Sequence, residues 1–463
     1  MTGGAQAEAA GGLAAAGGDA AGASDARLGG TFWALFGINV LSVLASGVTT
    51  AMLPLYVRGP LGGGAAAVGI VVGVASLLAM VLRPPLGELA DRIGPRPVAI
   101  AGALLAIAGE LLLLVAGVLA LGGVGRMLTG FGGATLNTMI TIWVIETALP
   151  GARGRALSIF GVSVWIGLGL GPPLGERLLD QFGFTAVWAA TAALSTGALC
   201  LLLALRTAPR PRGGPRASGG AWLAPLKAVA RAGAGGAISW AGQGVVLTFL
   251  ILHLQARGIG DGGGLLGPGS VFTIFAASVI SARLLLRSLP DRVGGARSAA
   301  ISLLAVAGGL VLIALARSFG LAAVGALVLG GGYAVLYPSL MLVAIASVPP
   351  ERRGSATGAV LAYMDLGMAA GATAGGLLAA WQGEALAFWV AAAAQLVGVV
   401  AIWGARDAPA PPTDASAPAF DASAPPNAEG EPASYASAAE HEAVGGSPRD
   451  APAHLQVDPT QTR

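Results

Sequence analysis

Charged residues are scarce in this sequence: only 11% of its 463 residues are Asp, Glu, Lys or Arg, against roughly 25% in an average soluble domain. Cysteine occurs once, at Cys200, which excludes an intramolecular disulfide and a cysteine-based metal cluster. Histidine occurs three times at scattered positions, and the sequence has no Walker loop, metal-ligand cluster or nucleophile elbow. We therefore expect neither an enzyme nor a cofactor.

Long apolar runs are abundant instead: 55% of the residues are hydrophobic and the mean hydropathy is +0.76. About 20 apolar residues in a helix cross the ~30 Å hydrocarbon core of a bilayer. The sequence predicts an all-α membrane protein with twelve such helices, at residues 31–56, 65–86, 98–118, 121–146, 156–177, 185–205, 234–255, 268–289, 298–316, 320–346, 355–380 and 385–404.

The basic residues lie in short loops, which favours the lipid bilayer as partner and argues against nucleic acid. Most of them follow even-numbered helices, and the odd-numbered loops hold only Arg58, Arg177, Arg257 and Arg317. By the positive-inside rule both termini are then cytoplasmic, in a multi-pass protein of the cell's inner (plasma) membrane. Residues 206–233 are typical of a cytoplasmic linker, and the low-complexity stretches 1–30 and 405–463 of disordered tails.

The two halves of the chain resemble each other at a shift of 200 residues. Corresponding residues include Arg83 and Arg283, Asp91 and Asp291, Gly94 and Gly294, Gly125 and Gly325, and Gly167 and Gly367. Each repeat holds six helices, so the two repeats share one orientation. The pattern predicts two pseudo-symmetric six-helix bundles, 31–205 and 234–404, with a ligand cavity between them.

The loop after the second helix carries the sequence Gly87-Glu88-Leu89-Ala90-Asp91-Arg92-Ile93-Gly94-Pro95-Arg96. We expect Gly87 to permit close helix approach and Gly94 to turn the chain. The loop resembles the signature of the major facilitator superfamily, and the resemblance covers about residues 31–404. It implies the major facilitator fold and a gate that stabilises the outward-facing state; ordinary loop charge is the alternative. The implied gate residues are Arg83, Gly87, Asp91, Arg92, Gly94, Arg96, Glu146 and Arg155.

Two further patterns resemble motifs of that family. Helix four carries Arg126-x-x-Thr129-Gly130-x-Gly132-Gly133-Ala134, similar to a pattern associated with proton coupling, with Thr129 in place of Gln; the alternative is that Arg126 snorkels to the interface. Helix five carries Gly167-x-x-x-Gly171-Pro172-x-x-Gly175, similar to the antiporter motif. The alternative there is generic small-residue packing, because helix eleven repeats the spacing without the proline.

Two acids, Glu110 and Asp365, are predicted to lie well inside spans. An ionised, unpaired carboxylate there costs several kcal/mol, so we expect each to be protonated or paired. Asp365 lies on helix eleven, which lines the cavity in the family that the chain resembles, and is the candidate for proton or cation coupling; a fixed structural hydrogen bond is the alternative. For Glu110 we hypothesise an ion pair with Arg126.

A set of polar and aromatic residues on helices one, four, seven and ten is expected to line the cavity. These are Asn39, Ser42, Ser46, Thr49, Asn137, Thr141, Trp240, Gln243, Tyr333 and Tyr337. Aromatic faces with few charges suit apolar or weakly cationic ligands, although each residue could equally serve helix packing.

Together these features predict a monomeric secondary active transporter of the drug or metabolite:proton antiporter type, which exports small organic molecules by alternating access. Proton-coupled uptake by symport is one alternative. A non-transporting membrane sensor or scaffold is the other.

Overall fold

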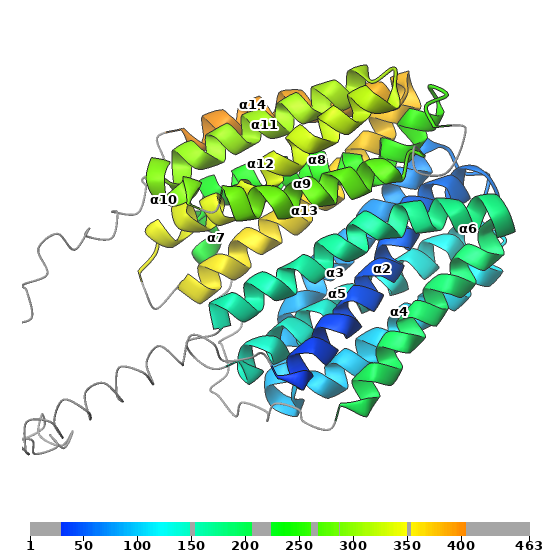
Figure 1. The fold of residues 1–463 in the computed structure, drawn as a ribbon, viewed down its shortest axis with the longest axis horizontal. Coiled ribbons are helices and arrows are strands. Elements are labelled where there is room, and N and C mark those ends of the chain that lie inside the picture. Colours follow the sequence, from blue (N-terminus) through cyan, green and yellow to red (C-terminus); the bar gives the residue numbers. More distant parts are fainter. Residues whose placement is uncertain are drawn as a thin grey trace, which may run out of the picture. The chain divides into compact units, whose positions relative to one another are not determined.

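A computed structural model describes residues 29–148, 153–205, 224–260, 267–286, 288–349 and 353–403, and these residues form helices and short turns without a strand (Figure 1). The first half of the chain holds α2 (Gly30–Arg58), α3 (Ala65–Ile93), α4 (Pro95–Val115), α5 (Leu119–Thr147) and α6 (Arg153–Ala204). The second half holds α7 (Ala224–Ala228), α8 (Ala230–Gln255), α9 (Ser270–Leu285), α10 (Leu289–Val293), α11 (Gly295–Leu315), α12 (Phe319–Ala346), α13 (Arg353–Gln382) and α14 (Glu384–Ile402).

Every predicted span overlaps a helix. α6 covers two of them, because Gly183, with φ 76° and ψ −178°, breaks it into two passes. Among the described residues nine helices are long and apolar enough to cross a membrane by length and composition; α9 is shorter, and the 30-residue α13 is not one of the nine. The predicted all-α membrane fold is confirmed.

Some sequence expectations fall outside the described residues. These are the tails, apart from residues 29–30 of the first, and residues 206–223 of the linker. The remainder of the predicted linker is largely helical, since α7 occupies residues 224–228 and α8 already begins at Ala230.

The turns repeat at the same shift as the sequence. Gly94 has φ 88° and ψ 157°, and Gly294 has φ 89° and ψ 153°. Gly183 and Gly383 likewise have φ 76° and 83°. L-residues rarely adopt these conformations, so glycine is required at all four turns. We call the side of the helices near Gly94 and Gly294 the Gly94 end, and the opposite side the Gly183 end.

Polar side chains close helix ends in the same way in both halves. The Tyr56 hydroxyl donates to the carbonyl of Ala116, after the end of α4 (2.6 Å), and Arg257 Nη1 donates to the carbonyl of Ala316, after the end of α11 (2.7 Å). Ala116 and Ala316 are again 200 residues apart. Carbonyls at a helix end lack helical partners. The first half satisfies one from α2, and the second half satisfies one from the turn that follows α8.

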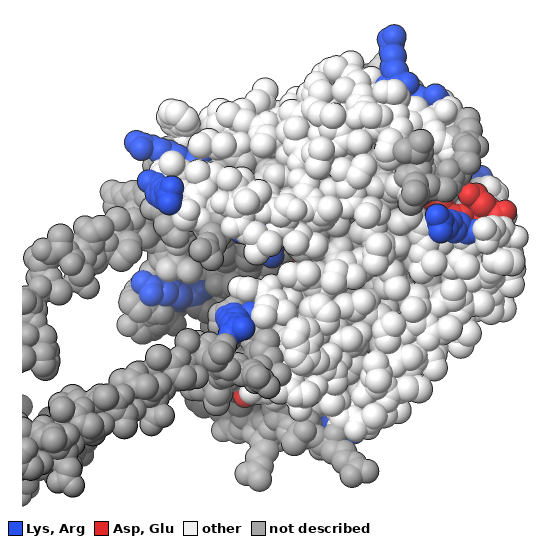
Figure 2. Space-filling view, in the orientation of Figure 1, with Lys and Arg blue, Asp and Glu red and all other residues white. Residues whose placement is uncertain are grey.

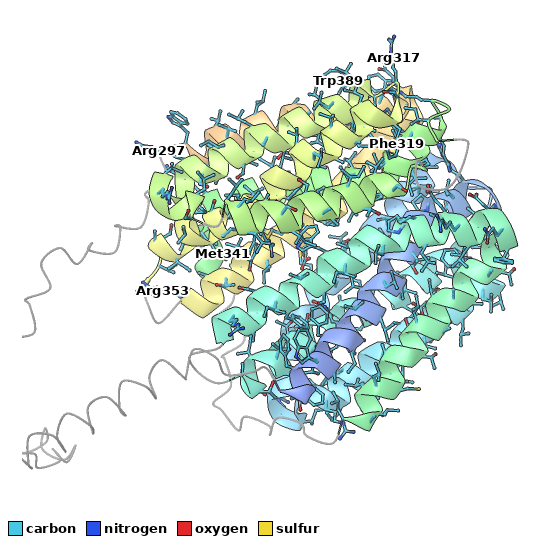
Figure 3. The ribbon with its side chains drawn as sticks, viewed as in Figure 1. Arg297, Arg317, Phe319, Met341, Arg353 and Trp389 are labelled. Carbon is cyan, nitrogen blue, oxygen red and sulfur yellow. The ribbon has the colours of Figure 1, made fainter. Side chains whose placement is uncertain are left out.

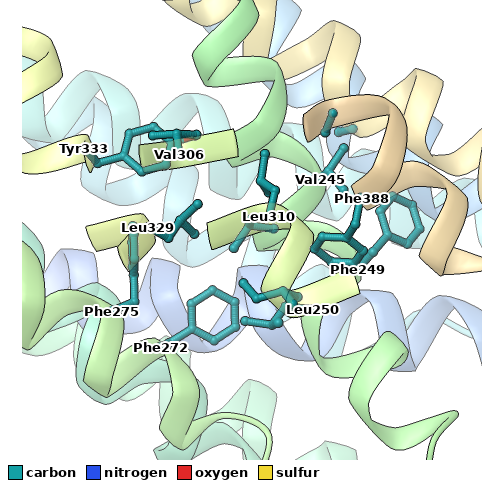
Figure 4. Close-up of a cluster of buried hydrophobic side chains, with 14 of the residues drawn as sticks. Val245, Phe249, Leu250, Phe272, Phe275, Val306, Leu310, Leu329, Tyr333 and Phe388 are labelled. Atoms are coloured by element: carbon teal, nitrogen blue, oxygen red, sulfur yellow. The ribbon is translucent and has the colours of Figure 1, made fainter. Parts of the chain in front are cut away.

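The helices pack in two groups. α2 to α6 contact one another and form the N half, and α8 to α14 contact one another and form the C half. The core of the C half includes Phe249 of α8, Phe272 of α9 and Leu310 of α11 (Figure 4). The broad middle of the face in Figure 2 is nearly uncharged, and charged side chains gather toward the two ends of the helices.

The two halves contact each other chiefly along two helix pairs, α3 with α13 and α6 with α9. The sequence repeat relates the two seams to each other. α3 of the first seam corresponds to α9 of the second, and α6 of the second seam begins 200 residues before α13 of the first. α2 and α3 also contact α8, over fewer residues.

Candidate functional site

The first seam joins α3 and α13 through small residues. A Cβ atom on Gly376 would lie 2.8 Å from the Cα of Gly69, and one on Gly73 would lie 2.9 Å from the carbonyl oxygen of Ala369. Only glycine lets the two backbones approach this closely. The N and C halves are thus in direct backbone contact at this seam.

The second seam joins α6 and α9 and is more polar. The Thr273 hydroxyl donates to the carbonyl of Gly169 (2.6 Å), and a Cβ atom on Gly169 would lie 2.7 Å from the Cβ of Ala276. One turn nearer the Gly94 end, the ring of Trp165 meets Phe275 edge to face at 5.7 Å.

Aromatic side chains continue from this seam into the C half. Phe275 contacts Tyr333 edge to face at 5.9 Å, and Tyr333 contacts Trp240 in the same way at 5.7 Å. From the same helix α9, the guanidinium of Arg283 lies 5.8 Å from the Trp165 ring centre, which is cation–π distance. The predicted cavity residues Trp240 and Tyr333 are therefore brought together, in contact with residues that the sequence did not single out.

A groove of about 560 Å³ lies beside the second seam. Its lining is mostly apolar, with one cation, and comes from α2, α6, α9 and α12: Leu44, Leu170, Pro173, Leu174, Arg177, Ser270, Thr273, Ile274 and Phe319. Phe319 lies at the end of the bundle that also carries Arg317 and Trp389, whereas Arg297 and Arg353 lie at the opposite end (Figure 3). None of the ten predicted cavity residues lines this groove.

Asp365 lies on the face of α13 that forms the first seam. It precedes Ala369 by four residues and Ala372 by seven, a spacing that places all three on one side of a helix. Ala369 and Ala372 both abut α3, at Gly73 and Gly69. Asp365 is half-buried and lies one turn beyond the tightest contacts, toward the Gly94 end, so the first seam carries a carboxyl group on this side of its glycines.

Glu110 has a different environment. It is buried, and its Oε1 accepts a hydrogen bond from Ser195 Oγ at 2.9 Å. The helix that carries it, α4, packs against α3, α5 and α6, all in the N half. The bond to Ser195 favours a packing role inside this half.

The hypothesised ion pair between Glu110 and Arg126 is wrong. In the part of the chain that the structure describes, the remaining Glu110 oxygen and the Nε of Arg126 lack hydrogen-bond partners. Arg126 lies seven residues before Gly133, which abuts Ser46 of α2, whereas Glu110 reaches α6. The Arg126 side chain is buried rather than snorkelling to an interface.

Only part of the predicted gate is described. Gly94 turns the chain as expected, with its N–H donating to Ala90 (2.8 Å). Arg92 is exposed and pairs with Glu88 at 3.9 Å, and Arg96 Nη2 donates to the carbonyl of Leu203 (3.0 Å). Both arginines thus bond within the N half.

The remaining gate residues add little to this picture. The expectation for Gly87 is wrong, because a Cβ atom there would meet nothing within 4 Å. Glu146 and Arg155 lie in the last turn of α5 and the first turn of α6, and each has an interaction partner. The side chains of Arg83 and Asp91 lie outside the described part of the chain.

The glycines of helix five serve close packing. Cβ atoms on Gly167, Gly171 and Gly175 would lie 2.7 Å from Leu44 N, Val48 N and Met52 Cγ of α2. Their repeat mates on α13 abut α8 in the same way. A Cβ atom on Gly269, at the start of α9, would lie 2.9 Å from the carbonyl carbon of Pro172. The motif therefore also borders the second seam.

The polar residues predicted for helices one and four are partly consumed by packing. Asn137 Nδ2 donates to Asn39 Oδ1 (2.8 Å) and Asn39 Nδ2 donates to Ser163 Oγ (2.7 Å), which ties α2, α5 and α6 together. Thr141 donates to the carbonyl of Asn137 (2.8 Å). Ser46 abuts Gly133, and Ser42 is buried. Thr49 Oγ1 and Gln243 Oε1 are buried without a partner among the described residues, and Tyr337 is half-buried.

Residues that link the halves at the Gly183 end were missed. Glu176 Oε2 accepts the backbone N–H of Gly269 (2.8 Å), from α6 to the start of α9. Arg58 Nη2 pairs with Glu384 Oε1 at 2.6 Å, from α2 to α14. The available signal was an acidic residue at a predicted span end, Glu176 within 156–177 and Glu384 directly before 385–404.

Comparison with known proteins covers most of the chain. The sequence model described as Major Facilitator Superfamily matches residues 35–287 and 262–448. The chain is 28% identical over 383 residues to the uncharacterized MFS-type transporter YhhS of Escherichia coli strain K12, covering 80% of this chain and 91% of that protein. The corresponding protein of Salmonella enteritidis PT4 is 29% identical over the same length.

Solved structures share the fold at low identity. A peptide transporter POT in complex with alafosfalin superimposes with a TM-score of 0.70 at 17% identity, covering 82% of this chain and 96% of that one. The nucleoside transporter NupG gives 0.69 at 16% identity, and the human organic anion transporter MFSD10 gives 0.62 at 18%; each covers 80% of this chain and 98% of the other.

Proposed function

Because this chain belongs to the Major Facilitator Superfamily, and is thus a membrane transporter rather than an enzyme, we propose that it is a proton-coupled secondary transporter that exports small organic molecules by alternating access. The two halves rock against each other, so that the seams α3–α13 and α6–α9 open first at one end of the helices and then at the other. Transport needs no cofactor, and a single chain holds both halves. It resides in the plasma membrane with both termini cytoplasmic, as the loop charges favour.

The position of Asp365 is the observation that carries the coupling proposal. Ionisable groups inside a span mark proton pathways, and Asp365 has an interaction partner in this structure. Asp365 lies on the seam face of α13, one turn past the contact of Ala369 with Gly73. Rocking of the halves changes its surroundings, so its proton is taken up in one state and released in the other.

The substrate class follows from the aromatic path across the second seam. Trp165 and Trp240 are half-buried at the two ends of this path, whereas Phe275 and Tyr333 are buried between them. The ring surface of the two tryptophans suits apolar or weakly cationic organic molecules. The neighbours of known structure are described as carriers of peptides, nucleosides and organic anions, all small organic solutes. The glycine and proline pattern of helix five favours export; uptake by symport remains the second candidate because Asp365 serves either direction.

The experiment is flux into proteoliposomes under an imposed proton gradient, with a panel of lipophilic cationic dyes and neutral drugs. We expect gradient-driven flux for wild type and a loss of at least about tenfold for Asp365→Asn, which removes the ionisable group and keeps the shape. Glu110→Gln is the matched control, because Glu110 bonds to Ser195 inside the N half; its flux should stay within about twofold of wild type.

Two results would contradict the assignment. Intact gradient-driven flux in Asp365→Asn removes Asp365 as the coupling group. If the panel compounds move only in the same direction as the protons, so that whole cells accumulate the dye, the protein is a symporter rather than an exporter.

A further inference from the structure

The Gly183 end of the seam between α6 and α9 holds a carboxylate whose repeat mate is a glycine. Glu176 corresponds to Gly376, and Gly269 corresponds to Gly69, at the shift of 200 residues. At the first seam Gly69 and Gly376 meet backbone to backbone. At the second seam a glutamate side chain occupies the equivalent place and accepts the Gly269 N–H (2.8 Å).

The Glu176 contact is made across the two halves and depends on their distance. Gly269 is the N-cap of the 16-residue helix α9, where free N–H groups and the helix dipole favour a negative charge. A Cβ on Gly269 would lie 2.7 Å from Glu176 Oε2 and 2.9 Å from the carbonyl carbon of Pro172. The bond therefore exists only while α6 and α9 are in contact.

Glu176 is otherwise poorly satisfied in this state. Its Oε1 is buried without a hydrogen-bond partner among the described residues. The hydrogen bond to Gly269 is thus the contact that compensates for its burial, and water could replace it once the seam opened. Such a group stabilises the closed seam without making closure irreversible.

The Arg58–Glu384 pair forms a second link at the same end. Their charged atoms are 2.6 Å apart, with Arg58 at the end of α2 in the N half and Glu384 in the first turn of α14 in the C half. The side chain of Glu384 is only 11% exposed, so the pair is shielded from solvent more than an ordinary surface ion pair.

We propose that Glu176 with Gly269, and Arg58 with Glu384, form a clamp that holds the Gly183 end of the two halves closed and must open once in every transport cycle. The clamp is the counterpart of the loop motif at the Gly94 end, whose described arginines bond within the N half. With the cytoplasmic termini proposed above, the clamp closes the outer side, so this inference rests on the proposed alternating-access function.

Distances between spin labels test the clamp directly. In a Cys200→Ser background, the pair Gln181→Cys and Arg317→Cys reports the Gly183 end, and Ile93→Cys with Arg297→Cys reports the Gly94 end; the four labelled positions are exposed. Replacing both acids, with Glu176→Ala and Glu384→Ala, should increase the population with a longer Gly183-end distance about tenfold, the change expected from losing one charge-assisted hydrogen bond. The Gly94-end distance should shorten in the same molecules.

Further variants keep the test decisive. Glu110→Gln is the matched control, because it removes a buried acid that bonds to Ser195 inside the N half, and it should leave both distances unchanged. Glu176→Gln keeps an oxygen that can accept the Gly269 N–H and should open the end less than Glu176→Ala. Gly269→Ala pushes on the same contact from α9 and should lengthen the distance even if the double variant fails to fold.

The clamp is overturned if Glu176→Ala, Glu384→Ala and Gly269→Ala all give the distance distributions of Glu110→Gln. The labels report opening without any substrate. A clamp that opens as expected in a protein that moves no member of the flux panel would therefore contradict the proposed transport function and leave the clamp standing.

Discussion

At the scale of single residues, glycine decides how closely the helices approach. A Cβ on Gly171 would lie 2.7 Å from Val48 N and 2.8 Å from Gly47 Cα. Both atoms belong to the backbone of α2, which cannot move aside as a flexible side chain can. This is why a residue without a side chain occupies the position.

We predict that Gly171→Ala destabilises the folded protein by about 1–3 kcal/mol, the usual cost of overpacking a tight contact. The measurement is the thermal unfolding temperature in detergent, which should fall by several degrees. Gly37→Ala on α2 is the control, because a Cβ there meets nothing within 4 Å. Equal unfolding temperatures for the two variants would show that the contact between α2 and α6 is not as tight as described.

Residue-level predictions from the sequence succeeded where a backbone property was at stake. Gly94 was predicted to turn the chain and does so. Pairings between side chains were less predictable: Glu110 bonds to Ser195 rather than to Arg126, because the sequence does not say which face of α4 meets which helix. Glu176 was missed because its span was expected to end at residue 177, whereas α6 continues to Gly183.

At the scale of elements, turn glycines set where each helix ends. Gly383 separates α13 from α14 and has φ 83° and ψ 168°, a region that is essentially restricted to glycine. Its neighbour Glu384 then enters the first turn of α14 and meets Arg58. The position of one clamp residue thus depends on this turn.

Gly383→Ala should therefore destabilise the protein by about 1–3 kcal/mol through backbone strain alone, because a Cβ there meets nothing within 4 Å. Gly117→Ala, in the turn between α4 and α5, is the control: it is equally open and has no positive φ. Unfolding temperature measures both. A drop of the same size in Gly117→Ala would mean that turn flexibility, not left-handed backbone, explains the loss.

Elements were the most predictable level because a span is recognised by the length of its apolar run. Length and hydropathy did not predict every helix end. α9 ends at Leu285, earlier than the predicted 289, because the short α10 (Leu289–Val293) takes over before Gly294. The helical residues 224–233 were assigned to the linker because basic residues, glycine and proline are frequent around them.

At the scale of the whole molecule, the sequence repeat predicts the symmetry between the two halves but not the contacts between them. Shared turns at Gly94 and Gly294, and at Gly183 and Gly383, follow from the shift of 200 residues. Contact between Gly69 and Gly376, and between Glu176 and Gly269, could not be predicted from the repeat, because a second conformation of the same sequence would separate them. The sequence therefore predicts the fold, and the structure adds which residues join the two halves.

The central claim is that the halves must separate at the seams in every cycle, and a reversible cross-link tests it most directly. A Cβ on Gly73 would lie 3.4 Å from the Cβ of Thr373, close to the spacing that a disulfide requires. It would also lie 2.9 Å from the carbonyl oxygen of Ala369, so the flux of the reduced double variant is measured first, as the reference. In a Cys200→Ser background, Gly73→Cys with Thr373→Cys joins α3 to α13. We predict that oxidation abolishes gradient-driven flux of the panel in proteoliposomes, and that reduction restores it, while each single-cysteine variant is insensitive to oxidant. Undiminished flux in the fully cross-linked protein would contradict the account.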